Sequence, residues 1–173
     1  MFFEELKIPK QRVAVVIGKK GETKKLLERK TSTKLRISRD GEVSISSDEN
    51  INIFNTHPII LAIGRGFNPE IALLLLNETY MLEIISLKDY TKSEKDLFRI
   101  RARIIGREGN AWKMIEKLSD AFISVYGKTV GIISKIEDAG LAKRAVEKLL
   151  KGAPHGNVYR YIEMEKKKSL MQR

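Results

Sequence analysis

A six-residue stretch, Val16-Ile17-Gly18-Lys19-Lys20-Gly21, recurs 88 residues later as Ile104-Ile105-Gly106-Arg107-Glu108-Gly109. The same offset aligns apolar positions further along the chain, for example Leu35 with Ile123. One pair of glycines three positions apart is uninformative, because glycine is common. Two copies with downstream apolar positions in register indicate an internal repeat. We therefore interpret the chain as two similar units, each about half of the 173 residues.

The spacing of apolar residues predicts the same order of elements in each unit. Apolar residues recur three and four positions apart on both sides of each glycine pair, which predicts helices there. Alternation of apolar and polar residues then predicts two strands joined by a turn. In the first unit we expect strands at 2–8, 35–37 and 43–45 and helices at 13–17, 22–30 and 69–76. In the second unit we expect strands at 80–87, 123–125 and 130–132 and helices at 97–105, 110–118 and 138–150.

The third helix of each unit is expected where a capping residue precedes an apolar run. Asn68 is expected to cap a helix that has Pro69 in its first position and Leu73–Leu76 in the core. Asp138 is the expected cap of the third helix in the second unit. His57 precedes a proline and is interpreted as a surface or capping residue at the start of a helix.

The net charge of +11 is unevenly distributed along the chain. Residues 1–46 carry 12 basic and 6 acidic groups, residues 47–87 carry one basic and five acidic groups, and residues 88–173 carry 20 basic and 11 acidic groups. A solvated surface rich in Lys and Glu explains any single basic run. The whole distribution favours a polyanionic partner.

Composition excludes several classes of protein. The chain has no cysteine, so disulfide scaffolds, cysteine-ligated zinc sites and thiol nucleophiles are excluded. No apolar run is long enough to span a membrane, and the first residues do not resemble a signal peptide. The expectation is therefore a cytoplasmic protein without a cofactor, a metal site or a membrane partner.

The glycine pair between two helices is suited to contact with a nucleic-acid backbone. Paired glycines permit positive φ and leave no Cβ in the way, so phosphates can approach the amides at the start of the following helix. Neighbouring apolar residues and a strand then wall a groove for unstacked bases. The candidate RNA-binding residues are Ile17, Gly18, Lys19, Lys20, Gly21, Lys24, Lys25 and Arg36 in the first unit, and Arg103, Ile105, Gly106, Arg107, Glu108, Gly109, Trp112 and Lys113 in the second.

The order of elements and the motif Ile-Gly-x-x-Gly resemble two type I KH domains in tandem. The stretches 8–25, 62–70 and 152–159 resemble more narrowly the partner-of-Nob (Pno) and Krr group of small-subunit ribosome assembly proteins, in its archaeal branch. The resemblance covers nearly the whole chain. It implies an α+β fold of two KH domains, at 1–79 and at 80–173 with a C-terminal helical extension, each a three-stranded sheet packed against helices.

The resemblance also implies a function and partners. They are those of a non-enzymatic factor that binds the 3′ region of precursor small-subunit rRNA as single-stranded RNA, beside a Nob-type endonuclease or other assembly and translation factors. No catalytic residue is expected, because the aspartates are scattered, the two histidines are isolated and no phosphate-binding loop of the ATPase type occurs.

Two alternative functions and three assignments of residues or units stay open. The first alternative function is that of a KH module in mRNA regulation or RNA decay. The second is that of a protein-interaction scaffold, which Glu108 keeps open because it puts a negative charge inside the second loop. The basic second half favours the second unit as the main RNA reader, whereas Lys19 and Lys20 favour the first. Trp112 either stacks a base or packs between the units, and Arg65 either contacts a partner or points to solvent.

Overall fold

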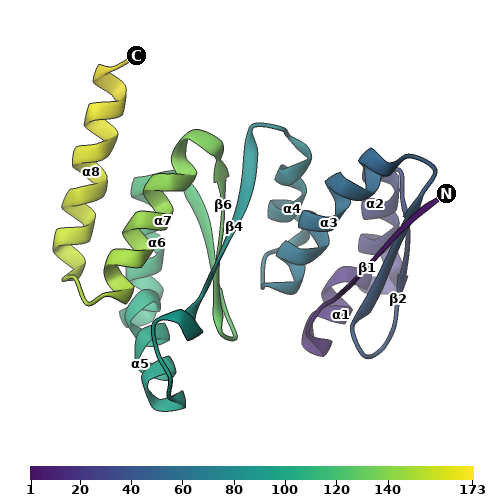
Figure 1. The fold of residues 1–173 in the computed structure, drawn as a ribbon, viewed down its shortest axis with the longest axis horizontal. Coiled ribbons are helices and arrows are strands. Elements are labelled where there is room, and N and C mark those ends of the chain that lie inside the picture. The colour runs from purple at the N-terminus through teal and green to yellow at the C-terminus, as the bar shows by residue number, and fades with distance from the viewer. The chain divides into compact units, whose positions relative to one another are not determined.

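The computed structural model describes all residues from Met1 to Arg173, which form two compact units, Met1–Tyr80 and Met81–Arg173 (Figure 1). The first unit contains β1 (Phe2–Lys7), α1 (Lys10–Ile17), η1 (Lys19–Gly21), α2 (Glu22–Thr31), β2 (Lys34–Ile37), β3 (Glu42–Ser47), α3 (Asn50–Gly64), α4 (Pro69–Ala72) and η2 (Leu73–Leu76). Its sheet has the order β1-β3-β2 and is antiparallel throughout.

The second unit repeats this plan and adds a helix. Its elements are β4 (Tyr80–Ser86), η3 (Leu87–Asp89), α5 (Glu94–Ile105), η4 (Arg107–Gly109), α6 (Asn110–Ser119), β5 (Ala121–Tyr126), β6 (Thr129–Lys135), α7 (Ile136–Leu150) and α8 (His155–Met171). The sheet order, β4-β6-β5, is the same as in the first unit. The prediction of an α+β chain with two three-stranded sheets packed against helices is confirmed.

The two units also share details of their backbone conformation. Four residues other than glycine have positive φ, and they form two pairs separated by the offset of the repeat. Lys20 and Glu108 have φ of 54° and 56°, and Ser32 and Asp120 both have φ of 54°. Both members of each pair lie at the same step of the fold, so the two units share their tight turns as well as their elements.

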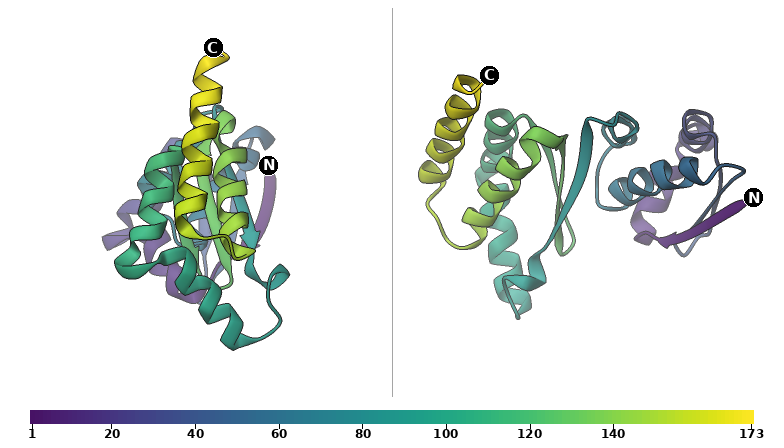
Figure 2. Two further views of the ribbon diagram at one scale, coloured as in Figure 1. Left: turned by 90° about the vertical axis from the view of Figure 1, so that its left-hand side faces the viewer. Right: turned by 45° about the horizontal axis from the view of Figure 1, so that its top comes forward.

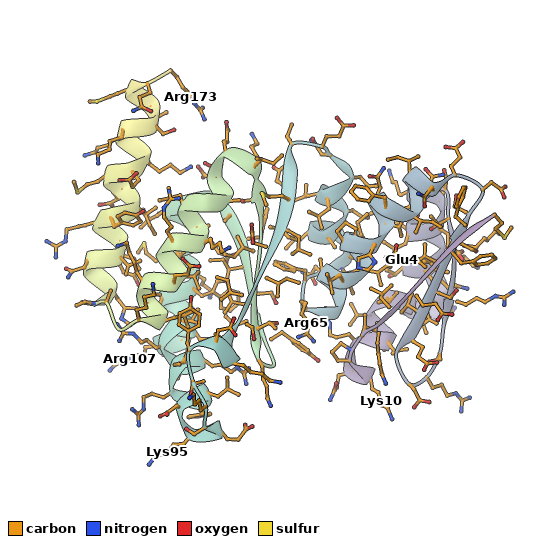
Figure 3. All side chains as sticks on the ribbon, in the orientation of Figure 1. Glu4, Lys10, Arg65, Lys95, Arg107 and Arg173 are labelled. Carbon is orange, nitrogen blue, oxygen red and sulfur yellow. The ribbon has the colours of Figure 1, made fainter.

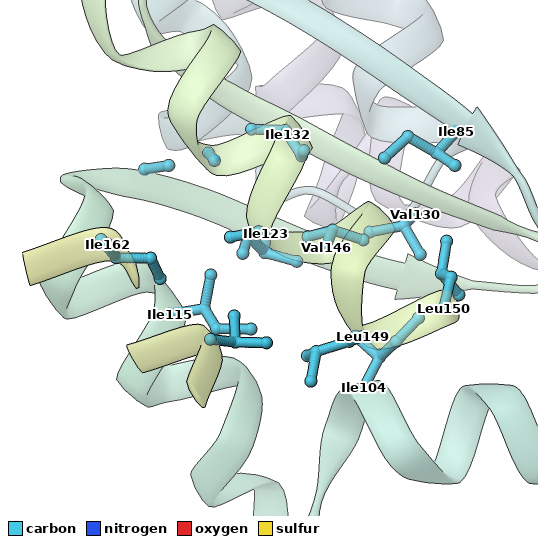
Figure 4. Close-up of a cluster of buried hydrophobic side chains, with 14 of the residues drawn as sticks. Ile85, Ile104, Ile115, Ile123, Val130, Ile132, Val146, Leu149, Leu150 and Ile162 are labelled. Atoms are coloured by element: carbon cyan, nitrogen blue, oxygen red, sulfur yellow. The ribbon is translucent and has the colours of Figure 1, made fainter. Parts of the chain in front are cut away.

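The core of the second unit lies between its sheet and its helices (Figure 4). Ile104 from α5, Ile115 from α6 and Ile132 from β6 are almost completely buried there, with Val146 from α7. Ile162 from α8 completes the cluster. The last helix therefore belongs to the hydrophobic core of the second unit.

Helix α8 packs on α6 and α7, which themselves cover the sheet (Figure 2). The ammonium group of Lys166 lies 2.7 Å from Asp138 Oδ1 in α7 and 2.9 Å from Asp120 Oδ2 at the end of α6. These contacts join three helices, and the two carboxylates raise the pKa of Lys166 although burial opposes them. None of the helices has both the length and the apolar character needed to cross a bilayer.

Residues 69–76 are helical as expected, with Asn68 at the N-cap position and Pro69 in the first turn, but they do not form the third helix of the first unit. That helix is α3, with Pro58 in its interior, whereas residues 69–76 form only the short α4 and η2. A proline inside a helix removes one hydrogen bond and commonly ends the helix. Here the burial of Ile53 before the proline and of Ile59 and Ile60 after it outweighs that loss.

Three local expectations about single residues also differ from the structure. His57 lies inside α3 with its Nδ1 2.7 Å from Glu4 Oε1, and does not begin a helix. Leu73–Leu76 are half-buried, not core residues. Helix α7 begins at Ile136, so Asp138 lies in its first turn, where its carboxylate binds Lys166.

Candidate nucleic-acid interface

The two glycine loops have the same backbone conformation. Gly18 and Gly106 both have φ of 73°, with ψ of 175° and −179°. Gly21 and Gly109 both have φ of 75° and lie in the left-handed region directly before α2 and α6. Neither helix has a side-chain cap at this end, and the amides of Glu22 and Asn110 donate to the carbonyls of Lys19 and Arg107 within the loop itself.

The first glycine of each loop is required by the fold itself. A Cβ at Gly18 would lie 2.2 Å from Oγ1 of Thr23, and one at Gly106 would lie 2.5 Å from Cβ of Ala111. Both distances are far below van der Waals contact. The first glycine therefore allows the loop to close against the following helix.

The surroundings of the second glycine differ between the two loops. No atom lies within 4 Å of the place a Cβ would take at Gly21. At Gly109 the ring of Trp112 lies 3.6 Å and the side chain of Lys113 3.8 Å from that place. The first loop is therefore the more open of the two, and the second is partly covered by its own helix.

The predicted site residues differ in exposure. Lys19, Lys20, Lys25, Arg36, Arg107, Glu108 and Lys113 are exposed, Gly109 is buried, and Ile17, Gly18, Gly21, Lys24, Arg103, Ile105, Gly106 and Trp112 are half-buried. The side chain of Arg107 points outward from its unit (Figure 3). The structure brings most of these residues together on and beside the two loops.

Arg36 and Arg103 lie apart from this surface. Arg36 alternates with the buried Leu35 on β2 and lies opposite Ser44 of β3. Arg103 donates from Nε to the carbonyl of Leu149 at 3.0 Å and from Nη2 to the carbonyl of Ala153. Its guanidinium is therefore used to cap the C-terminal end of α7.

Arg12 makes the corresponding contacts in the first unit, which the sequence did not indicate. Its Nε donates to the carbonyl of Ile63 at 2.8 Å and its Nη2 to that of Phe67 at 2.9 Å. Gly64 lies so close to Ile8 that a Cβ would meet its side chain at 2.7 Å. The stretches 8–25 and 62–70, which carry the family resemblance, thus pack against each other behind the first loop.

The stretch 152–159 has the same role in the second unit. Ala153 accepts from Arg103, and His155 Nε2 donates to the carbonyl of Arg103 at 2.9 Å. These contacts hold the end of α5 that leads into the glycine loop.

Arg65, at the end of α3 in the first unit, is half-buried.

In each unit one glutamate joins the helix after the glycine loop to the strand that follows it. Leu35 N donates to Oε1 of Glu28, and Ile123 N donates to Oε2 of Glu116, both at 2.9 Å. Burial raises the pKa of Glu116, although the hydrogen bond from Ile123 and the contact with Trp112 lower it. The signal in the sequence was the glutamate at the same offset in both units.

This shift predicts a pH-dependent contribution to stability. With a raised pKa the folded chain binds the Glu116 proton more tightly than the unfolded chain, so the free energy of unfolding falls as pH rises from the ordinary value of 4.5 through the raised value. Glu116→Gln removes that component, because its amide oxygen still accepts from Ile123 without a charge. Urea unfolding over a pH series tests this, with the exposed Glu163→Gln as control. Parallel pH curves for the wild type and Glu116→Gln would contradict it.

The structure shows no group of three or more His, Asp or Glu side chains suited to hold a metal ion. Its repeated order of strand, helix, glycine loop, helix, two strands and helix defines a tandem type I KH-domain protein. A family model described as "Eukaryotic type KH-domain (KH-domain type I)", for the second KH domain of Pno1, matches residues 81–167, and a KH-domain model matches residues 3–59.

Three proteins show the narrower relationship. The chain is 46% identical over 169 residues to the KH domain-containing protein MJ0443 of Methanocaldococcus jannaschii, covering 95% of this chain and 74% of that protein. It is 49% identical, with a TM-score of 0.89, to a chain of the a/eIF2alpha-aDim2p-rRNA complex from Pyrococcus horikoshii OT3, covering 96% and 95% of the two chains. It is 33% identical over 99 residues to the pre-rRNA-processing protein pno1 of Aspergillus fumigatus, covering 56% of this chain and 39% of that protein.

The chain belongs to the Pno1/Dim2 family of KH-domain proteins, whose archaeal members it matches over nearly its whole length. The family resemblance inferred from the residues is thereby confirmed.

Proposed function

We propose that this protein binds single-stranded RNA through both glycine loops and acts, without catalysis, in processing and assembly of the small ribosomal subunit. The observation that carries the proposal is the pair of loops with one backbone conformation, each directly before a helix and each with exposed basic side chains. The aDim2p structure in complex with rRNA and the pre-rRNA-processing name of the fungal relative support it.

The loop geometry explains how an RNA strand would be held. Phosphate oxygens approach the first turn of α2 or α6, where the positive end of the helix dipole adds to the charge of Lys19 or Arg107. Bases then turn toward Ile17 or Ile105 and are recognised by shape and by their edges. Nothing in this arrangement activates a water or a hydroxyl group.

The molecules found in complex with a related protein suggest partners for this protein. The complex that contains aDim2p also contains a/eIF2alpha, so a translation factor is a candidate partner alongside the 3′ region of small-subunit rRNA. A Nob-type endonuclease remains part of the proposal on the family resemblance alone, and a cytoplasmic location on the composition of the chain.

The test is an aspartate at the second glycine of each loop. Gly21→Asp and Gly109→Asp each are expected to weaken binding of a single-stranded oligonucleotide by about tenfold or more, since two charges 4 Å apart interact by about 1–4 kcal/mol at a protein surface. Fluorescence anisotropy with an oligonucleotide that copies the 3′ end of small-subunit rRNA measures the effect. Aspartate tolerates the left-handed backbone, so both variants should fold.

Gly127→Asp is the matched control. Gly127 also has positive φ and open space around it, but it lies in the turn between β5 and β6. Unchanged affinity in both loop variants would reject RNA binding through the loops. Crosslinking in cells separates the uses of RNA, because reads at the 3′ end of small-subunit rRNA support assembly and reads spread over mRNAs support a regulator.

A further inference from the structure

The same three-residue arrangement follows the glycine loop in both units. In the first unit Lys24 Nζ lies 3.9 Å from Glu28 Oε1, and that oxygen also accepts from Leu35 N at 2.9 Å. In the second unit Trp112 takes the place of Lys24, Glu116 that of Glu28 and Ile123 that of Leu35. A contact repeated at the offset of the whole repeat is a feature of the fold and not a chance pairing on the surface.

The arrangement links the helix that follows each glycine loop to a strand of the same unit. Lys24 and Trp112 lie in the first turn of α2 and α6, directly after the glycine loop, and each glutamate lies one turn further along the same helix. The backbone amide that binds the glutamate belongs to β2 or β5, an edge strand of the sheet in its own unit. The carboxylate therefore sets the separation of helix and strand.

In the second unit this link also reaches the loop. The ring of Trp112 lies against Gly109 and packs on the hydrophobic core of its own unit. Its Nε1 is buried without a hydrogen-bond partner, and the indole lowers the pKa of Glu116, which lies one turn further along α6. Trp112 is thus held by its own unit from two sides, which leaves its indole little freedom to move onto a base.

We propose that Glu28 and Glu116 are positioning residues that fix the width of the RNA groove, and that Trp112 holds Glu116 and the second loop in place instead of stacking on a base. This inference rests on the proposed function. Neither carboxylate faces RNA, because each is directed at a backbone amide of its own unit. Their contribution to binding is pre-organisation, which lowers the ordering cost of association.

The test compares two substitutions at Glu116 in a chain that carries Gly21→Asp, so that the second loop dominates binding. Glu116→Ala is expected to weaken binding of the rRNA 3′-end oligonucleotide by about tenfold, whereas Glu116→Gln stays within about twofold of its parent, because its amide oxygen still accepts from Ile123. Affinities are measured at a temperature at which circular dichroism shows every variant folded. Glu163→Ala, an exposed glutamate of α8, is the control.

Tryptophan fluorescence provides the second measurement, because Trp112 is the single tryptophan of the chain. With the indole held by Glu116 and the core, saturation with unlabelled oligonucleotide leaves its emission and its quenching by acrylamide nearly unchanged. Strong quenching on RNA binding would assign Trp112 to base stacking and overturn its positioning role. Equal affinities of Glu116→Ala and Glu116→Gln would overturn the role of the glutamate.

Failure of this inference is distinguishable from failure of the proposed function. If Gly109→Asp weakens binding and Glu116→Ala does not, the loops bind RNA and the positioning role is rejected. If neither Gly21→Asp nor Gly109→Asp has an effect, RNA binding through the loops is rejected and the positioning role with it.

Discussion

Replacing Gly106 by alanine is expected to lower the free energy of unfolding of the second unit by about 3–5 kcal/mol. Two costs add at this position. With φ of 73° and ψ of −179°, the backbone lies in a region that is essentially restricted to glycine, where strain amounts to about 1–3 kcal/mol. The new Cβ would also lie 2.5 Å from Cβ of Ala111, and such overpacking costs about 1–3 kcal/mol. Urea unfolding followed by circular dichroism measures the loss.

Gly109→Ala is the matched control in the same loop. Its backbone lies in the ordinary left-handed region, and the nearest atoms are at normal contact distance, so the expected loss is about 1–2 kcal/mol. The first unit should behave in the same way, with a large loss of unfolding free energy for Gly18→Ala and a small loss for Gly21→Ala. Equal losses at the first and second glycine would show that the close approach to the following helix is unimportant.

Arg103→Ala is expected to destabilise the second unit by about 3 kcal/mol. Its guanidinium donates to two carbonyls, of Leu149 and Ala153, and a hydrogen bond to a charged group contributes about 1.5–3 kcal/mol. Lysine keeps the charge but lacks the planar fork that reaches both acceptors, so Arg103→Lys should lose most of the same stability. Thermal unfolding compares these variants with Arg99→Ala, whose side chain is 73% exposed.

RNA affinity separates the two roles that Arg103 could have. As a cap of α7, it should leave the affinity of the folded protein unchanged in both variants. Were Arg103 a phosphate contact, Arg103→Lys would bind RNA well, Arg103→Ala would bind it weakly, and both would unfold like the wild type. That pattern would contradict the assignment from the structure.

The repeat and its loops were predictable because their signals are local. Glycine spacing, apolar periodicity and turn residues specify backbone conformation over a few positions, and two copies at one offset made them specific. The part of α3 before Pro58 was missed because a proline is a strong local signal for the start of a helix, while the burial that carries the helix through it comes from residues distant in the sequence. Arg103 was placed at the RNA surface for a related reason, since its charge is visible in the sequence and its acceptors are not.

The sequence by itself determined that this chain is a tandem KH protein with two equivalent loops, because a repeat of turn-forming and apolar residues leaves few folds available. The tertiary structure alone decided how the basic residues are used. Lys19, Lys20 and Arg107 stay exposed on the loops, whereas Arg12 and Arg103 cap helices behind them. An arginine donates to whichever acceptors the folded chain brings within about 3 Å of its guanidinium, and those acceptors are seldom its neighbours in sequence.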